Sequence, residues 1–234
     1  MDDGEYLALR FFLLPAGFLT MGLGMAMTIR ARLGVSAWNV LHLGLSQHLP
    51  ITVGQATQGV GLFIMACSAL MGIKPRLGTW LNMVLVGACL DLLLSSGLVP
   101  VPTHLPARAA LLLGGLAVLA LGMCLYMCAG LGAGPRDGLM LALSRRFPGR
   151  VAVIRALMEF SALAVGYVLG GPVGVGTLLA ALTLGWFLEG WFLTLYWARR
   201  YVPALYHLRV PPAIEAKLMK KSRWPVPGQG RATT

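Results

Sequence analysis

Residues 78–98 read GTWLNMVLVGACLDLLLSSGL, and residues 176–196 read GTLLAALTLGWFLEGWFLTLY, so an apolar segment with a Gly-Thr start recurs 98 positions later. The correspondence extends without a gap, because residues 23–94 and 121–192 share 19 identities over 72 aligned positions. An acid occupies the same place in both segments, Asp91 in the first and Glu189 in the second. A fixed period of this kind indicates one structural unit used twice.

The composition is typical of a membrane protein. Apolar residues make up 57% of the chain and charged residues 12%, compared with about 25% charged in an ordinary soluble domain. An apolar helix satisfies its own backbone hydrogen bonds, as a lipid environment requires. Runs of roughly 20 apolar residues, the length that crosses a bilayer, occur at 7–29, 53–72, 78–98, 108–129, 151–170 and 177–197.

A shorter segment follows the first run of each copy. Residues 36–48 and their counterparts 134–146 number 13 each, too few to cross a bilayer as a helix. We expect each to form a half-helix that either lies on the membrane surface or enters the membrane from one side. The predicted fold is all-α, with six transmembrane helices in two three-helix repeats, 1–99 and 100–197, and a half-helix after the first span of each.

The basic residues favour one orientation of these repeats. Three spans per copy make the second copy enter from the opposite face, so the repeats are expected to be inverted. With the N-terminus inside, the inner loops and the C-terminal tail hold 16 of the 19 Lys and Arg residues, leaving Arg30, Arg32 and Arg108 outside. Because basic residues accumulate on the cytoplasmic side, both termini are predicted to be cytoplasmic.

The net charge of +11 is carried by the ends of apolar runs and by the last 36 residues. This distribution is typical of topology signals and argues against nucleic-acid binding, which requires a basic face. We interpret residues 198–234 as a basic cytoplasmic tail, disordered at its end, that lies near anionic lipid headgroups. Docking of a partner protein on the tail is the alternative.

Three acidic residues fall within predicted spans: Asp91, Glu159 and Glu189. A carboxylate in hydrocarbon needs a cation, a proton or a water-filled cavity. In inverted copies Asp91 and Glu189 would both lie near the membrane midplane, where two acids could bind a cation or relay protons. The alternative is that each carboxyl group hydrogen-bonds a neighbouring helix and stabilises packing.

Arg155 precedes Glu159 by four residues, so the two side chains share one helix face. The favoured interpretation is a buried ion pair that holds this helix in the bundle. The alternative is a subsite for an anion, with Glu159 as the counter-ion.

The two half-helices begin with different chemistry at equivalent places. Trp38 and Asn39 in the first copy correspond to Arg136 and Asp137 in the second. Free N–H groups at a half-helix start point toward whatever occupies the break, and Arg136 would add positive charge there. An asymmetric binding site is one interpretation, and a simple turn with an interfacial Trp is the other.

The sequence contains no phosphate-binding loop, nucleophile–base pair or metal-ligand cluster. We therefore expect no enzymatic activity, no cofactor and no metal site. The four cysteines are expected to pack as small apolar residues. The Gly-Thr pairs at 78–79 and 176–177 are expected to allow close helix packing, and Gly114-Gly115 offers a surface for a homodimer.

The chain resembles the YczE-like bacterial membrane proteins, which are relatives of the YitT-like group, over most of residues 7–195. The resemblance is carried by Leu33-Gly34 with Trp38, by LGAGPRDGL at 131–139, by Arg155 with Glu159, and by GGPVGVGT at 170–177. The first copy departs from the family's Pro-Trp-Asp pattern by having Ala37 and Asn39. The resemblance implies a polytopic protein of the bacterial inner membrane and supplies no substrate.

These observations predict a transporter that moves a small solute or ion through a central site. The site would combine the midplane acids, the starts of both half-helices and the Arg-Glu pair: Asp91, Glu189, Trp38, Asn39, Arg136, Asp137, Arg155 and Glu159. A non-transporting scaffold or regulator, acting through its cytoplasmic loops and basic tail, is the alternative.

Overall fold

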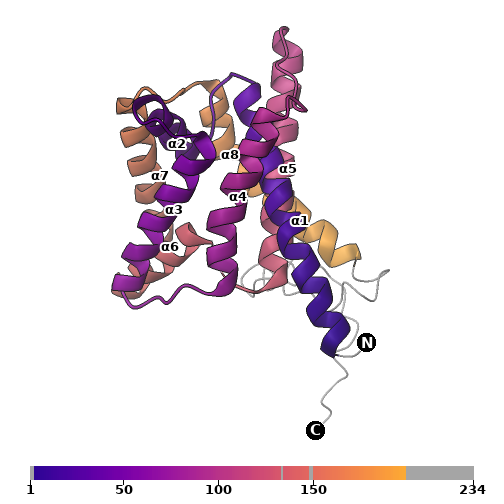
Figure 1. The fold of residues 1–234 in the computed structure, drawn as a ribbon, viewed down its shortest axis with the longest axis vertical. Coiled ribbons are helices and arrows are strands. Elements are labelled where there is room, and N and C mark those ends of the chain that lie inside the picture. The colour runs from indigo at the N-terminus through magenta and orange to yellow at the C-terminus, as the bar shows by residue number, and fades with distance from the viewer. Residues whose placement is uncertain (1–2, 133, 148–149, 199–234) are drawn as a thin grey trace.

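The computed structural model describes residues 3–132, 134–147 and 150–198, and the regular structure within them is helical (Figure 1). The predicted basic tail, 198–234, lies outside the described residues except for Ala198. The helices are α1 (Asp3–Arg30), α2 (Ala37–His48), α3 (Val53–Leu70), α4 (Leu77–Ser95), α5 (Leu105–Ala129), α6 (Pro135–Arg146), α7 (Val151–Val168) and α8 (Val175–Ala198).

Six of these helices, α1, α3, α4, α5, α7 and α8, are long and apolar enough to cross a membrane. Each coincides with a predicted span and differs from it by a few residues at the ends. The two remaining helices, α2 and α6, are the predicted half-helices, at 12 residues each. The protein is therefore an all-α, multi-pass membrane protein.

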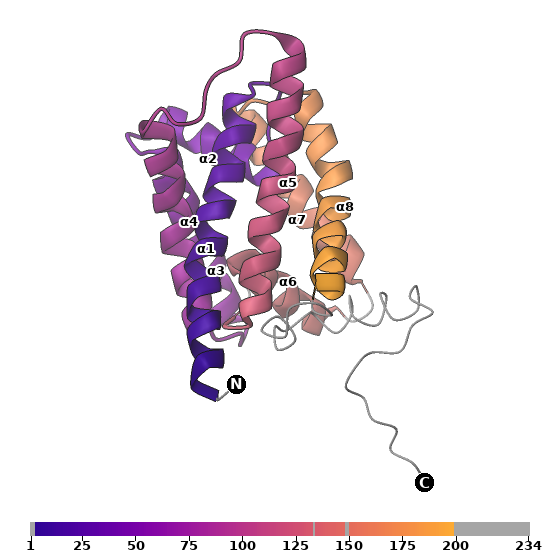
Figure 2. The ribbon, with the colours of Figure 1, turned by 90° about the vertical axis from the view of Figure 1, so that its right-hand side faces the viewer.

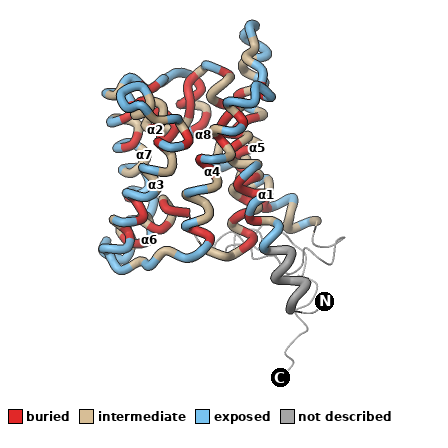
Figure 3. The backbone as a smooth tube through the Cα atoms, viewed as in Figure 1, coloured by how far each residue is buried: buried red, intermediate tan, exposed pale blue. Residues whose placement is uncertain are grey.

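α1 and α5 pack against each other along one side of the bundle and run in opposite directions (Figure 1 and Figure 2). Glycines permit this crossing, because a Cβ on Gly24 would lie 2.3 Å from the Leu119 nitrogen, and one on Gly122 would lie 2.5 Å from the Met21 nitrogen. Buried residues gather along this crossing (Figure 3). Gly115 packs there against Met27, which corrects the prediction that Gly114-Gly115 forms a dimer surface.

The half-helices pack against long helices of the other half of the chain. α2 contacts α7 as well as α3, and α6 contacts α3 as well as α7. α2 lies toward one end of the bundle and α6 toward the other (Figure 1). The predicted units 1–99 and 100–197 are therefore interlocked through their half-helices.

The shared Leu-Gly and Gly-Thr motifs hold each half-helix loop in place. The Gly176 amide donates to the Leu33 carbonyl at 2.7 Å, and the Gly78 amide donates to the Leu131 carbonyl at 3.2 Å. A Cβ on Gly176 would lie 2.5 Å from the oxygen of Gly34, whose φ of 100° also favours glycine. The prediction that the Gly-Thr pairs serve close packing is confirmed.

The two halves differ in how their last two long helices pack. α3 and α4 are in close contact, and a Cβ on Gly54 would lie 2.1 Å from the Gly87 oxygen. The residue 98 positions after Gly54 is Ala152, whose methyl group is incompatible with that approach. Among the described helices, α7 and α8 form no comparable packed pair. Ala152 therefore excludes between α7 and α8 the close approach that Gly54 allows between α3 and α4.

Candidate functional site

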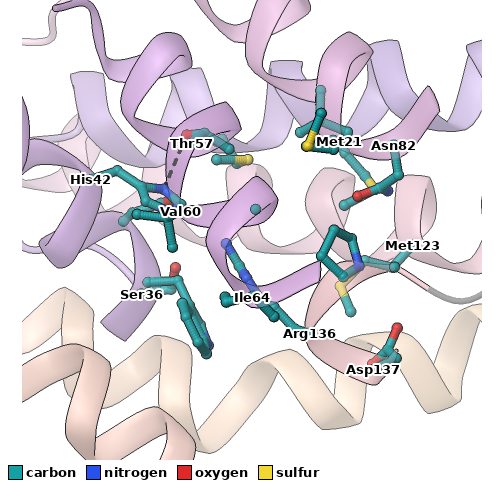
Figure 4. A pocket seen from close by; sticks show the side chains of 18 of the residues that line it. Met21, Ser36, His42, Thr57, Val60, Ile64, Asn82, Met123, Arg136 and Asp137 are labelled. Carbon is teal, nitrogen blue, oxygen red and sulfur yellow. Dashed lines mark hydrogen bonds between the residues drawn. The ribbon is translucent and has the colours of Figure 1, made fainter. Parts of the chain in front are cut away.

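A cavity of about 160 Å³ lies inside the bundle, and all eight helices contribute to its wall. Six of the chain's 12 methionines line it: Met21, Met25, Met83, Met123, Met140 and Met158. Its polar and charged lining comes chiefly from the two half-helices and from α3, α4, α5 and α7: Ser36, Trp38, Asn39, His42, Thr57, Asn82, Tyr126, Arg136, Asp137, Arg155 and Glu159. Figure 4 shows ten of the lining residues with labels.

The cavity wall follows the 98-residue period of the sequence. Twenty of its 25 lining residues form ten pairs whose members are 98 positions apart. The pairs that carry polar chemistry are Ser36 with Gly134, Trp38 with Arg136, Asn39 with Asp137, His42 with Met140, Thr57 with Arg155 and Gly61 with Glu159. Equivalent positions of the two copies therefore face one another across one space, and their side chains differ.

Trp38 and Arg136, which are equivalent residues, contact each other directly. The Arg136 guanidinium lies over the Trp38 ring, with its central carbon 4.5 Å from the ring centroid. The indole Nε1 of Trp38 donates a hydrogen bond of 3.1 Å to Glu159 Oε1. Trp38 therefore orders one cation by stacking and one carboxylate by hydrogen bonding.

Asp137 is held in a different way. The Tyr126 hydroxyl donates to Asp137 Oδ2 at 2.8 Å. Arg136 and Asp137 extend in different directions from α6 (Figure 4). The carboxylates of Asp137 and Glu159 are thus each fixed by an uncharged donor rather than by an Arg.

His42 is fully buried, and one of its two ring nitrogens has a hydrogen-bond partner among the described residues. Its Nδ1 lies 3.0 Å from the Thr57 hydroxyl oxygen, and that hydroxyl donates to the Val53 carbonyl at 2.9 Å. The Thr57 hydroxyl has one proton; in the tautomer in which that proton goes to the Val53 carbonyl, His42 donates its Nδ1–H to Thr57 and Nε2 is a hydrogen-bond acceptor. His42 Nε2 has no partner among the described residues, and the same is true of Asn82 Nδ2.

Two ionisable groups of the half-helices, His42 and Arg136, have shifted pKa values, and both lie outside the spanning helices. Burial, and secondarily the charge of Arg136, lower the pKa of His42 well below its usual value, so the imidazole is neutral at pH 7. Burial lowers the pKa of Arg136 to about 10, against the opposing effects of Glu159, Asp137 and Tyr126. The guanidinium therefore stays charged at pH 7.

Most of the predicted site residues meet in this cavity. Its lining includes Trp38, Asn39, Arg136, Asp137, Arg155 and Glu159. The predicted ion pair of Arg155 with Glu159 is not formed among the described residues, since Trp38 is the hydrogen-bond partner of Glu159 and Arg155 is exposed.

The two acids predicted at the midplane, Asp91 and Glu189, do not line the cavity. Asp91 accepts hydrogen bonds from the Thr52 hydroxyl and from the Gly54 amide, the latter at 2.8 Å. Thr52 is the N-cap of α3, so Asp91 ties α4 to the start of α3. Glu189 lies on α8 and is half-buried. The structure brings the half-helix starts together and leaves these two acids apart from them.

Sequence reasoning missed five polar residues of the cavity: Ser36, His42, Thr57, Asn82 and Tyr126. His42 carried a usable signal, because it follows Trp38 by four residues and therefore shares its half-helix face. Tyr126 and Asn82 sit on long helices that gave no such signal. Among the described residues, no three His, Cys, Asp or Glu side chains are grouped to hold a metal ion, and none of the four cysteines forms a disulfide.

Comparison with known sequences places the chain in a family. A family model described as "Family of unknown function (DUF6198)" matches residues 8–192, which includes both half-helices and all or most of each of the six long helices. The chain belongs to this family. It is 34% identical over 183 residues to the uncharacterized membrane protein YczE of Bacillus subtilis, covering 77% of this chain and 84% of that protein.

Two further relatives match the chain at lower identity. An uncharacterized protein of Haemophilus influenzae is 32% identical over 170 residues, covering 70% of this chain and 75% of that protein. The uncharacterized protein YyaS of Bacillus subtilis is 28% identical over 167 residues, covering 70% and 82%. No solved structure matches the chain. The expected YczE-like resemblance is confirmed.

Proposed function

We propose that this DUF6198 protein is a transporter, without enzymatic activity, that carries a small polar solute across the bacterial cytoplasmic membrane. The observation that supports this most is the pairing of cavity positions 98 residues apart. In transporters built from inverted repeats, the binding site lies at the interface of the repeats, and broken helices point their N-termini into it. Ser36 and Gly134, the N-cap residues of α2 and α6, both line this cavity.

The charge inside the bundle is a second support. Ionisable residues at membrane depth are costly and usually serve an ion or solute pathway. Arg136, Asp137 and Glu159 line one cavity, whereas a purely structural arrangement would pair them directly.

The transport cycle would depend on the difference between the two halves. α3 is anchored to α4 by the close approach at Gly54 and by the Asp91 hydrogen bonds. α7 has Arg150 at its N-cap position, without a side-chain hydrogen bond, and is not packed closely on α8. We propose that α7, together with the half-helix α2 packed on it, moves against the fixed α3–α4 pair. Both termini would be cytoplasmic, as the basic residues favour.

Cysteine accessibility tests this proposal without knowledge of the solute. Ser36 lines the cavity and makes no side-chain capping hydrogen bond, so Ser36→Cys is a mild change. In a background lacking the four native cysteines, Ser36→Cys should react with a membrane-impermeant thiol reagent in both right-side-out and inside-out membrane vesicles.

Ala26→Cys provides the matched control, because Ala26 is fully buried on a long helix outside the cavity and should stay unlabelled from either side. Labelling of Ser36→Cys from one side only, or from neither, would contradict alternating access. Labelling from neither side would favour the scaffold alternative, in which the charged residues of the cavity only stabilise helix packing.

A further inference from the structure

The cavity lining has equal numbers of basic and acidic side chains. Its lining contains four formally charged side chains, the basic Arg136 and Arg155 and the acidic Asp137 and Glu159. A bare cation or anion would leave such a site with a net charge at membrane depth, which is unfavourable. A solute that carries one positive and one negative group keeps the balance. This inference rests on the proposed transport function and deepens it by naming the class of solute.

One part of the cavity is suited to a carboxylate. Stacking on Trp38 orients the Arg136 guanidinium but uses none of its N–H donors. The nearby carboxylates accept from Trp38 and Tyr126, and neither forms an ion pair with Arg136 in the described part of the chain. Asn82 adds a buried N–H₂ donor without a partner. A planar guanidinium with an amide donor matches the acceptors of a carboxylate.

The remaining polar groups are suited to an ammonium group. His42 Nε2 is an acceptor without a partner among the described residues, and His42 is 0% exposed. Glu159 and Asp137 each have a second carboxylate oxygen with no hydrogen bond to a described residue. An ammonium group presents three N–H donors and one positive charge, which these acceptors can satisfy together.

The size of the cavity limits the solute. Its volume of about 160 Å³ is close to that of an engineered protein cavity of about 150 Å³ that holds benzene, a ligand of six heavy atoms. Alanine also has six heavy atoms. The methionines around the cavity have flexible, polarisable side chains that can adapt to a short aliphatic group.

We propose that the cavity binds a small amino-acid zwitterion. The solute's carboxylate contacts Arg136 and Asn82, and its ammonium group contacts His42 with Glu159 or Asp137. The short side chain lies against the methionine wall.

Thermal unfolding of the purified protein tests this assignment with L-alanine and with two smaller probes that each keep one of its charged groups. L-alanine carries both charges, propionate only the negative one and ethylamine only the positive one. L-alanine at millimolar concentration should raise Tm by several degrees, because a ligand that binds the folded state stabilises it. Propionate and ethylamine at the same concentration should leave Tm unchanged.

Variants connect any shift to the cavity. Arg136→Gln and Glu159→Gln should each weaken L-alanine binding at least tenfold. Arg145→Gln is the matched control, since Arg145 is an exposed residue of the same half-helix outside the cavity. Asn82→Ala removes an unpartnered donor without changing charge, so it reports on the site even if a charge variant fails to fold.

Each result decides the proposal. If propionate or ethylamine raised Tm as much as L-alanine does, the solute would be singly charged and the zwitterion proposal would be wrong. The absence of a shift with L-alanine would overturn the proposal outright. Neither result would contradict transport itself, which the labelling of Ser36→Cys tests separately.

Discussion

At the residue scale, Asp91 shows how a half-buried acid in a spanning helix can be structural rather than part of the solute site. Its carboxylate accepts hydrogen bonds from the Thr52 side chain and the Gly54 amide at the first turn of α3. An acid at a helix N-terminus also interacts favourably with the helix dipole. These hydrogen bonds to α3 compensate the carboxylate for its lost hydration. They agree with the alternative prediction, in which the acid stabilises helix packing.

Asp91→Ala should therefore lower the free energy of unfolding by about 2 kcal/mol, because capping and charge-assisted hydrogen bonds are lost. The affinity for L-alanine should not change. Tm in detergent and ligand titration of the same preparation measure the two effects. If Asp91→Ala left Tm unchanged but abolished L-alanine binding, Asp91 would instead be part of the solute site.

At the element scale, the crossing of α1 and α5 depends on glycines that admit no side chain. Gly24→Ala should destabilise the protein by about 1–3 kcal/mol, since the new Cβ would overlap the backbone of α5 at Leu119. The comparison variant is Gly59→Ala on α3, where no atom lies within 4 Å of the added Cβ. There the gain in helix propensity should leave stability unchanged or raise it by up to about 1 kcal/mol.

Thermal unfolding of both variants beside the wild type is the measurement. Equal effects of the two substitutions would mean that the α1–α5 crossing is not as close as the structure places it.

At the scale of the whole molecule, the loops that join α3 to α4 and α4 to α5 lie at opposite ends of the bundle (Figure 2). Lys74 is exposed in the first loop and Thr103 in the second. In a chain without native cysteines, Thr103→Cys should react with an impermeant thiol reagent on intact cells. Lys74→Cys should react only after the membrane is opened, because the basic residues favour a cytoplasmic position for its loop.

The opposite labelling pattern would invert the proposed orientation and leave the fold unchanged. Labelling of both positions on intact cells would contradict a single orientation of the chain in the membrane.

The number and lengths of the helices and the places of both half-helices could be predicted from the amino-acid sequence. Those features depend on local chemistry, because each apolar run must satisfy its own backbone hydrogen bonds in lipid. The 98-residue period also identified Trp38 and Arg136 as equivalent residues, and both reach the cavity.

The packing of the helices determines which polar groups share the cavity, and this could not be predicted from the sequence. The destination of a side chain on a spanning helix depends on how that helix crosses its neighbours, and sequence spacing does not specify the crossing. Hence Asp91 anchors α3 instead of facing Glu189, Glu159 accepts from Trp38 instead of pairing with Arg155, and His42 joins the site without any motif around it. Helix formation depends on residues that are neighbours in the sequence. Which side chains from the eight helices come into contact depends instead on how those helices pack.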